Sequence, residues 1–489
     1  MKEFFGRKIL KYQDQIFRDL KTLVAIPSVA DASAARRPFG ERSAETLRWI
    51  LNRARELGLD TVNVGDYAGH AEYGGGEAVA AVVTHVDVVP AGEGWTGDPY
   101  VLEKRGGRLY GRGTADDKGA AVVALYCLKA LKDEKVKCVR KARAIFGAGE
   151  EIASDDLKQY FQREALPELA FTPDAEYGVC NREKGILHVE LSAPADGSRL
   201  GSLHGGTVRN AVAASARAEA RCTAEECEAL EALSKKMDGK FSFQWSGGVL
   251  TAECAGRAAH AMEPQKGRNA AARLVRLFSS CFGGEALGAL WSFVDQKIGL
   301  ELDGSSLGLR REDAVSGPLT VNLGVAEQDN GVCRAVLDIR YPVTADGEEI
   351  LERLRAAAGA YGVKARVLAE QKPLFVPEDT PLIRMLKGAY ETVTGGRARL
   401  YGTGGGTYAR SLQNRGVAFG PVFPGEENHL HDVDEFIEIE KFMLHAQMCI
   451  RDRIRSIPHG ARTKPALKRG AGFARKIRRD FYGGSWKKQ

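Results

Sequence analysis

The apolar run Val79–Val83 places the strongest constraint on the fold of this chain. Its residues are all apolar and three are valines, which predicts a strand buried on both faces of a parallel sheet. His85 follows at the carboxyl end, the edge where open α/β folds place their sites. Asp87 can point to the same side, because strand side chains alternate with a period of two. A histidine beside a carboxylate is typical of a metal-binding imidazole, although the pair alone also fits a polar strand end.

Carboxylates stand at the ends of two further predicted elements. Asp116 precedes a helix predicted over Ala120–Leu131, so its side chain is either a metal ligand or a cap of that helix. Glu150 and Glu151 follow a strand predicted over Ala142–Phe146, and such a pair taken alone is usually a solvated turn. In a tight turn, however, one of the two can bind a metal while the other transfers protons.

A ligand set emerges when two later segments are added. Asp174 ends a third predicted strand, and His431 lies in a later polar segment of the chain. Two imidazoles and three carboxylates without a thiolate suit zinc in a catalytic site, or manganese or cobalt. They can hold two ions if one carboxylate bridges, and Glu150 beside them would serve as general base. The five candidate ligands are His85, Asp116, Glu151, Asp174 and His431.

The pattern of predicted elements divides the chain into domains. A length of 489 residues is too great for one compact core. Residues 1–185 and 378–447 show an α/β pattern, whereas residues 186–377 between them show strands with two amphipathic helices, an α+β pattern. We therefore expect one α/β domain interrupted by an inserted domain. Residues 448–489 form a basic tail.

Composition narrows the class of protein. The nine cysteines are scattered and form no Cys-x-x-Cys pair, which favours reduced thiols in a cytoplasmic protein. No apolar run approaches the ~20 residues of a membrane span, and the N-terminus lacks the pattern of a signal peptide. The net charge of +6 belongs to the tail, because residues 454–489 contain eleven basic residues and one acid. We expect no membrane partner, and only the tail could bind nucleic acid.

Five segments of the chain carry a resemblance to a known family: His85–Pro90 followed by Gly94-Trp95, Gly111–Gly119, Gly149–Glu151, Phe171–Glu176 and Gly404–Arg410. In these segments the chain resembles the M20 metallopeptidases, and within them the PepV-type dipeptidases. The resemblance extends from about Leu20 to about Lys441. It implies a zinc-peptidase-like α/β/α catalytic domain with an inserted α+β, ferredoxin-like lid domain.

The resemblance implies a role for each candidate ligand. Asp116 would bridge two metal ions, and the peptide bond after it, Asp116–Asp117, would be cis. Glu150 would activate the water between the ions. His429 competes with His431 as a ligand, but His431 fits the family's final ligand segment better. The implied partners of Asp116 are His85 and Asp174 on one ion, Glu151 and His431 on the other, with Asp87 orienting His85.

The inserted domain resembles the lid of the same family. His260 would stabilise the tetrahedral oxyanion, unless it is only a polar lid residue. Arg340 would clamp the substrate's C-terminal carboxylate through a bidentate pair, unless it is an ordinary surface ion-pair residue. Asn210 and the glycine-loop residues Gly405 and Gly406 match substrate-binding positions. The remaining histidines considered, His70, His188, His204 and His445, are interpreted as structural.

These features together predict a monomeric, cytoplasmic dipeptidase that acts on small dipeptides with a free N-terminus and holds two divalent ions, zinc in the first instance. Two alternatives stay open. One is another M20 amidohydrolase, such as an aminoacylase, a deacylase or a carboxypeptidase. The other is a catalytically silent metal-binding homologue, against which the intact Glu150 argues.

The tail has two interpretations. Met448–Asp452 has the sequence Met-Cys-Ile-Arg-Asp, which one reading frame of a transposon end used in DNA library preparation also encodes. One hypothesis is that residues from about Met448 are foreign to the natural gene. The alternative is a genuine basic arm that binds nucleic acid or acidic surfaces. An intact reading frame through Met448 in DNA amplified again from the source would end the first hypothesis.

Overall fold

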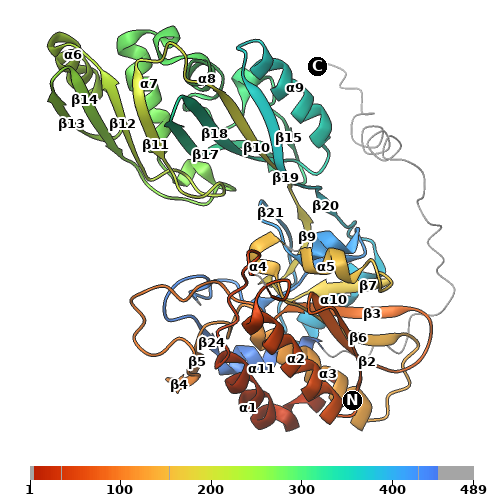
Figure 1. The fold of residues 1–489 in the computed structure, drawn as a ribbon. Coiled ribbons are helices and arrows are strands. Elements are labelled where there is room, and N and C mark those ends of the chain that lie inside the picture. The colour runs from red at the N-terminus through yellow and green to blue at the C-terminus, as the bar shows by residue number, and fades with distance from the viewer. Residues whose placement is uncertain (1–4, 35, 154, 428, 450–489) are drawn as a thin grey trace, which may run out of the picture.

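The computed structural model describes residues 5–34, 36–153, 155–427 and 429–449, which form two lobes, each built on one large sheet (Figure 1). Of the predicted basic tail, only Met448 and Cys449 fall within the described residues, where they end the last helix and are buried. Across the described ranges, no helix combines the length and the apolar character needed to cross a membrane.

The lower lobe in Figure 1 contains a nine-stranded mixed sheet with the order β1-β2-β6-β3-β7-β22-β9-β20, in which β21 also pairs with β9. The predicted strand at Val79–Val83 is β3, which lies parallel to β6 on one side and β7 on the other. The strands of this sheet are β1 (Asp60–Val64), β2 (Ala68–Tyr73), β3 (Val79–His85), β6 (Lys141–Gly147), β7 (Leu169–Thr172), β9 (Val179–Glu183), β20 (Leu374–Phe375), β21 (Leu400–Thr403) and β22 (Gly416–Ala418).

Helices cover both faces of this sheet, because its strands are apolar on both sides. In β6, Phe146 packs into one core cluster and the adjacent Ile145 into another. The predicted α/β/α arrangement of the catalytic domain is therefore confirmed. The first face carries η1 (Phe5–Tyr12), α1 (Gln13–Val24), α2 (Glu41–Glu56), α3 (Lys118–Asp133) and α11 (Ile439–Cys449). The second carries α5 (Asp155–Tyr160) and η6 (Tyr408–Leu412), while α10 (Pro381–Thr394) packs against α11 and β9.

A glycine sets the start of α2. The helix begins at Glu41, because Gly40 turns the chain with a φ of 87° that a residue with a side chain rarely adopts. The Ser43 hydroxyl instead donates a hydrogen bond to the carbonyl oxygen of Ala148 at 2.6 Å. It thus ties the helix to the turn that follows β6.

The upper lobe, the lid, is an eight-stranded antiparallel sheet with helices packed against one face (Figure 1). Its described residues form four α-helices rather than the two predicted, and one of the four, α8, is too short to show a helical period. The sheet order is β13-β14-β12-β11-β17-β18-β10-β19. The strands are β10 (Gly185–Pro194), β11 (Leu200–Gly205), β12 (Ser215–Arg221), β13 (Lys240–Ser246), β14 (Val249–Ala255), β17 (Thr320–Asp329), β18 (Val332–Tyr341) and β19 (Lys364–Gln371). The helices are α6 (Ala224–Ser234), α7 (Ala270–Phe282), α8 (Ala289–Phe293) and α9 (Gly347–Gly359).

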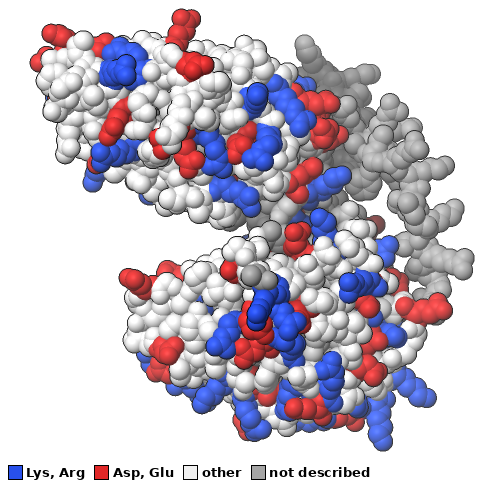
Figure 2. Space-filling model, in the orientation of Figure 1, with Lys and Arg blue, Asp and Glu red and all other residues white. Residues whose placement is uncertain are grey.

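Two chain crossings join the lobes. The first leads from β9 into β10, and the second returns from β19 into β20, which pairs antiparallel with β9. Figure 2 shows an open hollow between the lobes beside these crossings. The remaining short elements are β4 (Glu103–Arg105), β5 (Arg108–Tyr110), β8 (Ala175–Glu176), β15 (Glu312–Asp313), β16 (Gly317–Pro318), β23 (Pro421–Val422), β24 (Phe436–Glu438), α4 (Glu150–Ala153), η2 (Pro264–Lys266), η3 (Gly284–Leu287), η4 (Val294–Ile298) and η5 (Ser305–Leu307).

Two buried histidines make the stability of the fold depend on pH. Nδ1 of His70 accepts a hydrogen bond from the Tyr160 hydroxyl at 2.8 Å, and burial lowers the pKa of His70 to about 4. Nδ1 of His445 accepts from the Tyr177 hydroxyl at 2.7 Å, and burial lowers the pKa of His445 to about 3. An unfolded histidine has a pKa near 6.5, so the unfolded chain binds more protons below that pH.

Lowering the pH from 7.5 to 5 is therefore expected to reduce the free energy of unfolding by roughly 2 kcal/mol for each of these histidines. The contribution is fully present above pH 6.5 and is lost as the pH falls toward the folded-state pKa. Urea unfolding at both pH values measures it. The variant His70→Gln should lose roughly 2 kcal/mol less than the parent chain over this range. The same loss in both proteins would show that His70 does not titrate as described.

Candidate metal centre and substrate site

Three parallel strands bring the candidate ligands to one edge of the sheet. In the register of β3 and β6, His85 lies opposite Gly147, so Glu150 and Glu151 follow just beyond this point. On the other side β7 pairs with β3 and ends at Thr172, two residues before Asp174. The apolar strands thus fix where the polar side chains emerge, as the parallel-sheet prediction requires.

Asp116 lies between two histidines. Nε2 of His85 is 2.9 Å from Oδ1 of Asp116, and Nε2 of His431 is 2.9 Å from Oδ2. The alternative role of Asp116 as a helix cap is wrong, because α3 begins at Lys118 and no side chain caps it. His429 points elsewhere, with its Nδ1 3.0 Å from the carbonyl oxygen of Val433. The Asp116–Asp117 peptide bond is cis.

Two ligand triads share Asp116. The ligand atoms of His85, Asp116 and Asp174 lie within 4.8 Å of one another, and so do those of Asp116, Glu151 and His431. Oε1 of Glu151 is buried without a hydrogen-bond partner, which fits an oxygen held for a cation. Imidazole and carboxylate donors of this kind suit divalent zinc, manganese or cobalt.

Hydrogen bonds between the candidate ligands shift their pKa values strongly. Although burial opposes ionisation, hydrogen bonds from His431 and His85 hold the pKa of Asp116 well below its usual range. The same bond to Asp116, followed by one to Glu151, raises the pKa of His431 to about 11. A divalent cation held by these ring nitrogens would compete with the protons, so its affinity would weaken as the pH falls.

Asp87 positions the two glutamates. Its Oδ1 accepts a hydrogen bond from the backbone N–H of Glu150 at 3.2 Å, and its Oδ2 accepts one from Glu151 at 3.1 Å. Nδ1 of His85 lies 3.5 Å from the Asp87 carboxylate and 3.1 Å from the Asp87 carbonyl oxygen. The Asp87 carboxylate therefore contacts both glutamates, and the Asp87 carbonyl oxygen lies closer to His85 than the carboxylate does.

Glu150 is available for proton transfer. Among the described residues, none donates a hydrogen bond to its carboxylate. Burial, and then the negative charge of Asp174, raise the pKa of Glu150 well above its usual value. Bound cations oppose this shift, because positive charge favours the ionised carboxylate. The alternative of a solvated turn is wrong for this pair, since Glu150 and Glu151 begin α4 and are only partly exposed.

Glu435 is a buried residue that the sequence analysis does not single out. Its Oε2 accepts from the guanidinium of Arg112 at 2.8 Å and from the N–H of Gly113 at 2.9 Å. Its Oε1 accepts from the N–H groups of Ala115 and Asp116 at 2.9 and 3.2 Å. Glu435 thereby holds the backbone of the turn that presents Asp116. The only sequence signal was its place four residues after His431.

A second buried pair, Tyr408 and Asp156, lies next to His85. The hydroxyl of Tyr408 donates a hydrogen bond to Oδ2 of Asp156, which also accepts from the N–H of Gly149 at 3.0 Å. A side chain at Gly147 would collide with this tyrosine, which explains why the end of β6 needs a glycine. The ring of Tyr408 meets the ring of His85 edge-on, with centroids 6.1 Å apart.

Arg340 is buried at the end of β18 with 3% of its surface exposed, so its interpretation as a surface ion-pair residue is wrong. Its Nε and Nη2 pair with the two carboxylate oxygens of Asp338 at 2.5 and 2.6 Å. Its Nη1 donates to the carbonyl oxygen of Gly404 at 2.9 Å. Three of the five guanidinium N–H groups are thus engaged, and two are left for a ligand. His188, predicted to be structural, lies 3.0 Å from Asp338 and supports this pair.

His260 is exposed and lies on a lid loop near Arg340. Its Nδ1 accepts a hydrogen bond from the N–H of Met262 at 3.1 Å, so the proton of the neutral ring lies on Nε2. Partial desolvation of the ring, and then the positive charge of Arg340, lower the pKa of His260. His260 is therefore a neutral hydrogen-bond donor at pH 7.

The other lid and loop residues lie around this arginine. Asn210 is exposed, and its carbonyl oxygen accepts from the N–H of Ala261 beside His260 at 2.9 Å. The carbonyl oxygen of Gly405 accepts from Arg410 at 2.6 Å. A side chain at Gly406 would collide with Arg410, so this position of the loop has room only for glycine. The predicted substrate residues thus share one neighbourhood.

Comparison with known proteins assigns the family. The model of peptidase family M20/M25/M40 matches residues 81–451. The chain belongs to the M20 peptidase family. It is 35% identical over 447 residues to "Putative dipeptidase YtjP" of Bacillus subtilis (strain 168), a match that covers 89% of this chain and 96% of the relative. The chain is therefore a metallopeptidase, a hydrolase whose family binds divalent metal.

Solved M20 structures share the fold. An M20 family metallo-carboxypeptidase from Sulfolobus solfataricus superposes with a TM-score of 0.57 at 17% identity, over 89% of this chain and 98% of that one. The dipeptidase Dug1p from Saccharomyces cerevisiae superposes with a TM-score of 0.56 at 13% identity, over 91% and 96%. The predicted combination of an M20 catalytic domain and a lid is thereby confirmed.

Proposed function

We propose that this M20 peptidase is a dipeptidase that holds two divalent ions and cleaves the peptide bond of a dipeptide with a free N-terminus. The observation that carries the proposal is the position of Asp116, whose two oxygens face two different histidines in two ligand triads. The name of the Bacillus subtilis relative supports the dipeptide as substrate. Zinc, or manganese or cobalt, would occupy the triads.

The residues of the chain would divide the chemistry between them. When bound, the ions supply Lewis-acid polarisation of the scissile carbonyl and lower the pKa of the attacking water. Glu150 would take a proton from that water and pass it to the leaving amine. His260 would donate from Nε2 to the oxygen that gains negative charge in the transition state. Asn210 and the Gly405–Gly406 backbone would border the bound substrate.

Arg340 would set the length of the substrate. Its two remaining N–H groups would bind the C-terminal carboxylate of the dipeptide, while the ligand triads hold the bond to be cleaved. Arg340 would thereby select peptides whose C-terminal carboxylate lies next to the bond to be cleaved. We propose a monomeric enzyme, as the resemblance to the PepV-type dipeptidases implies.

Hydrolysis of a dipeptide panel tests the proposed function. The metal would be removed with a chelator, and zinc, manganese or cobalt added back one at a time. Each dipeptide would be paired with its N-acetylated form and with a tripeptide that contains it. We expect metal-dependent cleavage of the free dipeptides only. Cleavage of the acetylated forms instead would indicate an aminoacylase, and no cleavage by folded, metal-loaded protein would indicate a silent site.

Arg340→Lys is expected to raise KM for dipeptides by about tenfold or more, with a smaller change in kcat, because lysine cannot pair bidentately. Activity on dipeptides would be compared with activity on their C-terminal amides. The parent enzyme should prefer the free acid, and the variant should lose most of that preference. Arg334→Lys on the same strand, where the arginine pairs with Glu190 at the surface, is the matched control. An unchanged preference in Arg340→Lys would remove Arg340 from the substrate site.

A further inference from the structure

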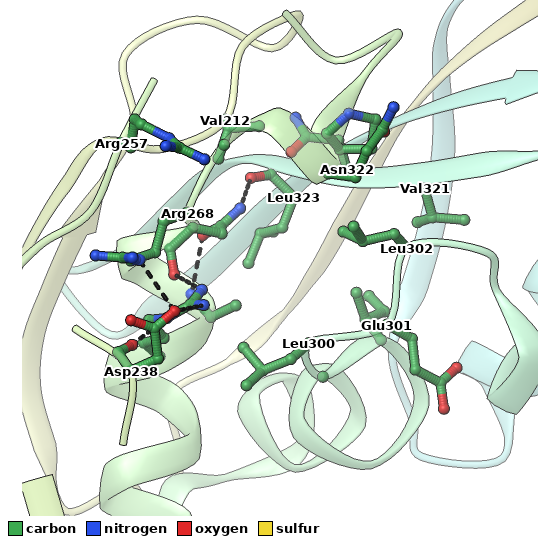
Figure 3. A pocket seen from close by; sticks show the side chains of 18 residues that line it. Val212, Asp238, Arg257, Arg268, Leu300, Glu301, Leu302, Val321, Asn322 and Leu323 are labelled. Atoms are coloured by element: carbon green, nitrogen blue, oxygen red, sulfur yellow. Dashed lines mark hydrogen bonds and ion pairs between the residues drawn. The ribbon is translucent and has the colours of Figure 1, made fainter. Parts of the chain in front are cut away.

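The lid contains a cavity of about 360 Å³ that lies apart from the ligand triads. It is bounded by the loop before α7, by α7 itself, by the segment after η4 and by β17 (Figure 3). This volume is within the range of small-molecule sites. Neither the metal ligands nor Arg340 line it.

One wall of the cavity is cationic. Arg257, Arg268 and Arg273 lie there together with Asp238. Nε of Arg268 pairs with Oδ2 of Asp238 at 3.1 Å, and Nη2 of Arg273 lies 3.4 Å from the same oxygen. Across the described part of the chain, no carboxylate pairs with the guanidinium of Arg257. The wall therefore holds one arginine without a carboxylate partner and one carboxylate that two other arginines share.

The opposite wall is mainly apolar, although Glu301 and Asn322 also belong to it. Leu300 and Leu302 point toward the cavity from the segment after η4, and Leu323 closes it from β17 (Figure 3). Leu300 is 44% exposed and Leu302 36%, unusual values for large apolar side chains. Two exposed leucines at the mouth of one cavity are a surface that an apolar ligand group would cover.

The cationic wall is also the base of the loop that carries His260. Arg257 and Arg268 pair their backbones, with N–H to carbonyl distances of 3.0 and 2.8 Å, and so close the loop between them. At the tip of the loop, Met262 packs against Gly404 of the catalytic lobe. The side chains of both closing residues line the cavity. An occupant of the cavity would thus contact the base of the loop whose tip reaches the substrate site.

We propose that this lid cavity binds a free α-amino acid with an apolar side chain. The carboxylate pairs with Arg257, the ammonium faces Asp238, and the side chain lies against Leu300, Leu302 and Leu323. An inorganic anion leaves the apolar wall uncovered, and an amine alone leaves Arg257 unpaired. Because the ligand holds the base of the His260 loop, its binding also restrains that loop. Binding at this cavity does not require the reaction proposed above.

Calorimetric titration of the chelator-treated chain with L-leucine tests this site. Three relatives of leucine separate the contributions: 4-methylpentanoate lacks the ammonium, 3-methylbutylamine lacks the carboxylate, and glycine lacks the apolar side chain. We expect L-leucine to bind and each relative to bind more weakly, the amine and glycine by at least about tenfold. Hydrogen exchange of residues 257–268 should slow when L-leucine is present. Failure of L-leucine to bind at millimolar concentration would overturn the proposal.

Variants distinguish this cavity from the substrate site. Arg257→Gln removes the carboxylate partner, and Leu300→Trp fills the mouth from an exposed position that a large side chain tolerates. Each should weaken L-leucine binding by at least about tenfold. Arg366→Gln, which removes an exposed lid arginine paired with Glu190, should leave binding unchanged. Binding that survives Arg257→Gln and Leu300→Trp, or that is lost in Arg340→Lys instead, would place leucine outside the cavity.

Discussion

Glu150→Gln is expected to lower kcat by about 10²–10⁴-fold, with little change in KM or in bound metal. Glutamine keeps the size of the side chain but cannot take a proton from water. In the structure, Asp87 fixes the backbone N–H of Glu150, and none of the described side chains donates to its carboxylate. The substitution therefore removes the proton acceptor without removing a hydrogen bond that the fold uses. Steady-state kinetics on a dipeptide, together with metal analysis, measure both quantities.

Glu176→Gln is the matched control for this experiment. Glu176 lies two residues after Asp174 and pairs at the surface with Arg399 at 2.6 Å, so it has the same chemistry outside the ligand triads. It should keep the parent kcat. Near-parental kcat in Glu150→Gln would assign the base elsewhere. Loss of metal in Glu150→Gln would instead make Glu150 a ligand and reassign the triads.

Strand patterns in the sequence predict the part of the site that parallel strands place. His85, Glu151 and Asp174 each follow a short apolar run, and parallel strands end at the same edge of a sheet. The alternation of side chains in an extended strand predicts Asp87 on the side of His85, and the two lie in contact although β3 ends at His85. Each of these positions depends only on where the residue lies along its own strand, so it can be predicted from the local sequence.

The parts that were missed depend on contacts between distant segments. Glu435 binds Arg112 across a separation of 323 residues, and Tyr408 binds Asp156 across 252. No local pattern marks either pair, because an acid in a loop has the same sequence appearance whether it is buried or solvated. Helix α8 of the lid was missed for a related reason, since four of its five residues are buried and it has no polar face. Burial by neighbours, which the sequence does not contain, decides all three cases.

Glu435→Ala is expected to lower the free energy of unfolding by about 3–5 kcal/mol, the usual effect of removing one partner of a buried ion pair. Glu435 and Arg112 are each only 1% exposed. The substitution leaves the guanidinium without its carboxylate and the N–H groups of Gly113, Ala115 and Asp116 without their acceptor. Urea unfolding in the presence of a chelator measures the effect on the fold alone, because bound metal would add its own stabilisation.

Glu438→Ala provides the comparison that isolates burial. Glu438 lies three residues further along the same segment and also pairs with an arginine, Arg108, at 3.5 Å, but both side chains are partly exposed. Its loss should cost no more than about 1 kcal/mol. Equal destabilisation by the two variants would mean that the Arg112 pair is no stronger than a surface contact. If Glu435→Ala is the more damaging, its metal affinity should fall as well, since the backbone that Glu435 holds is the turn that presents Asp116 to both histidines.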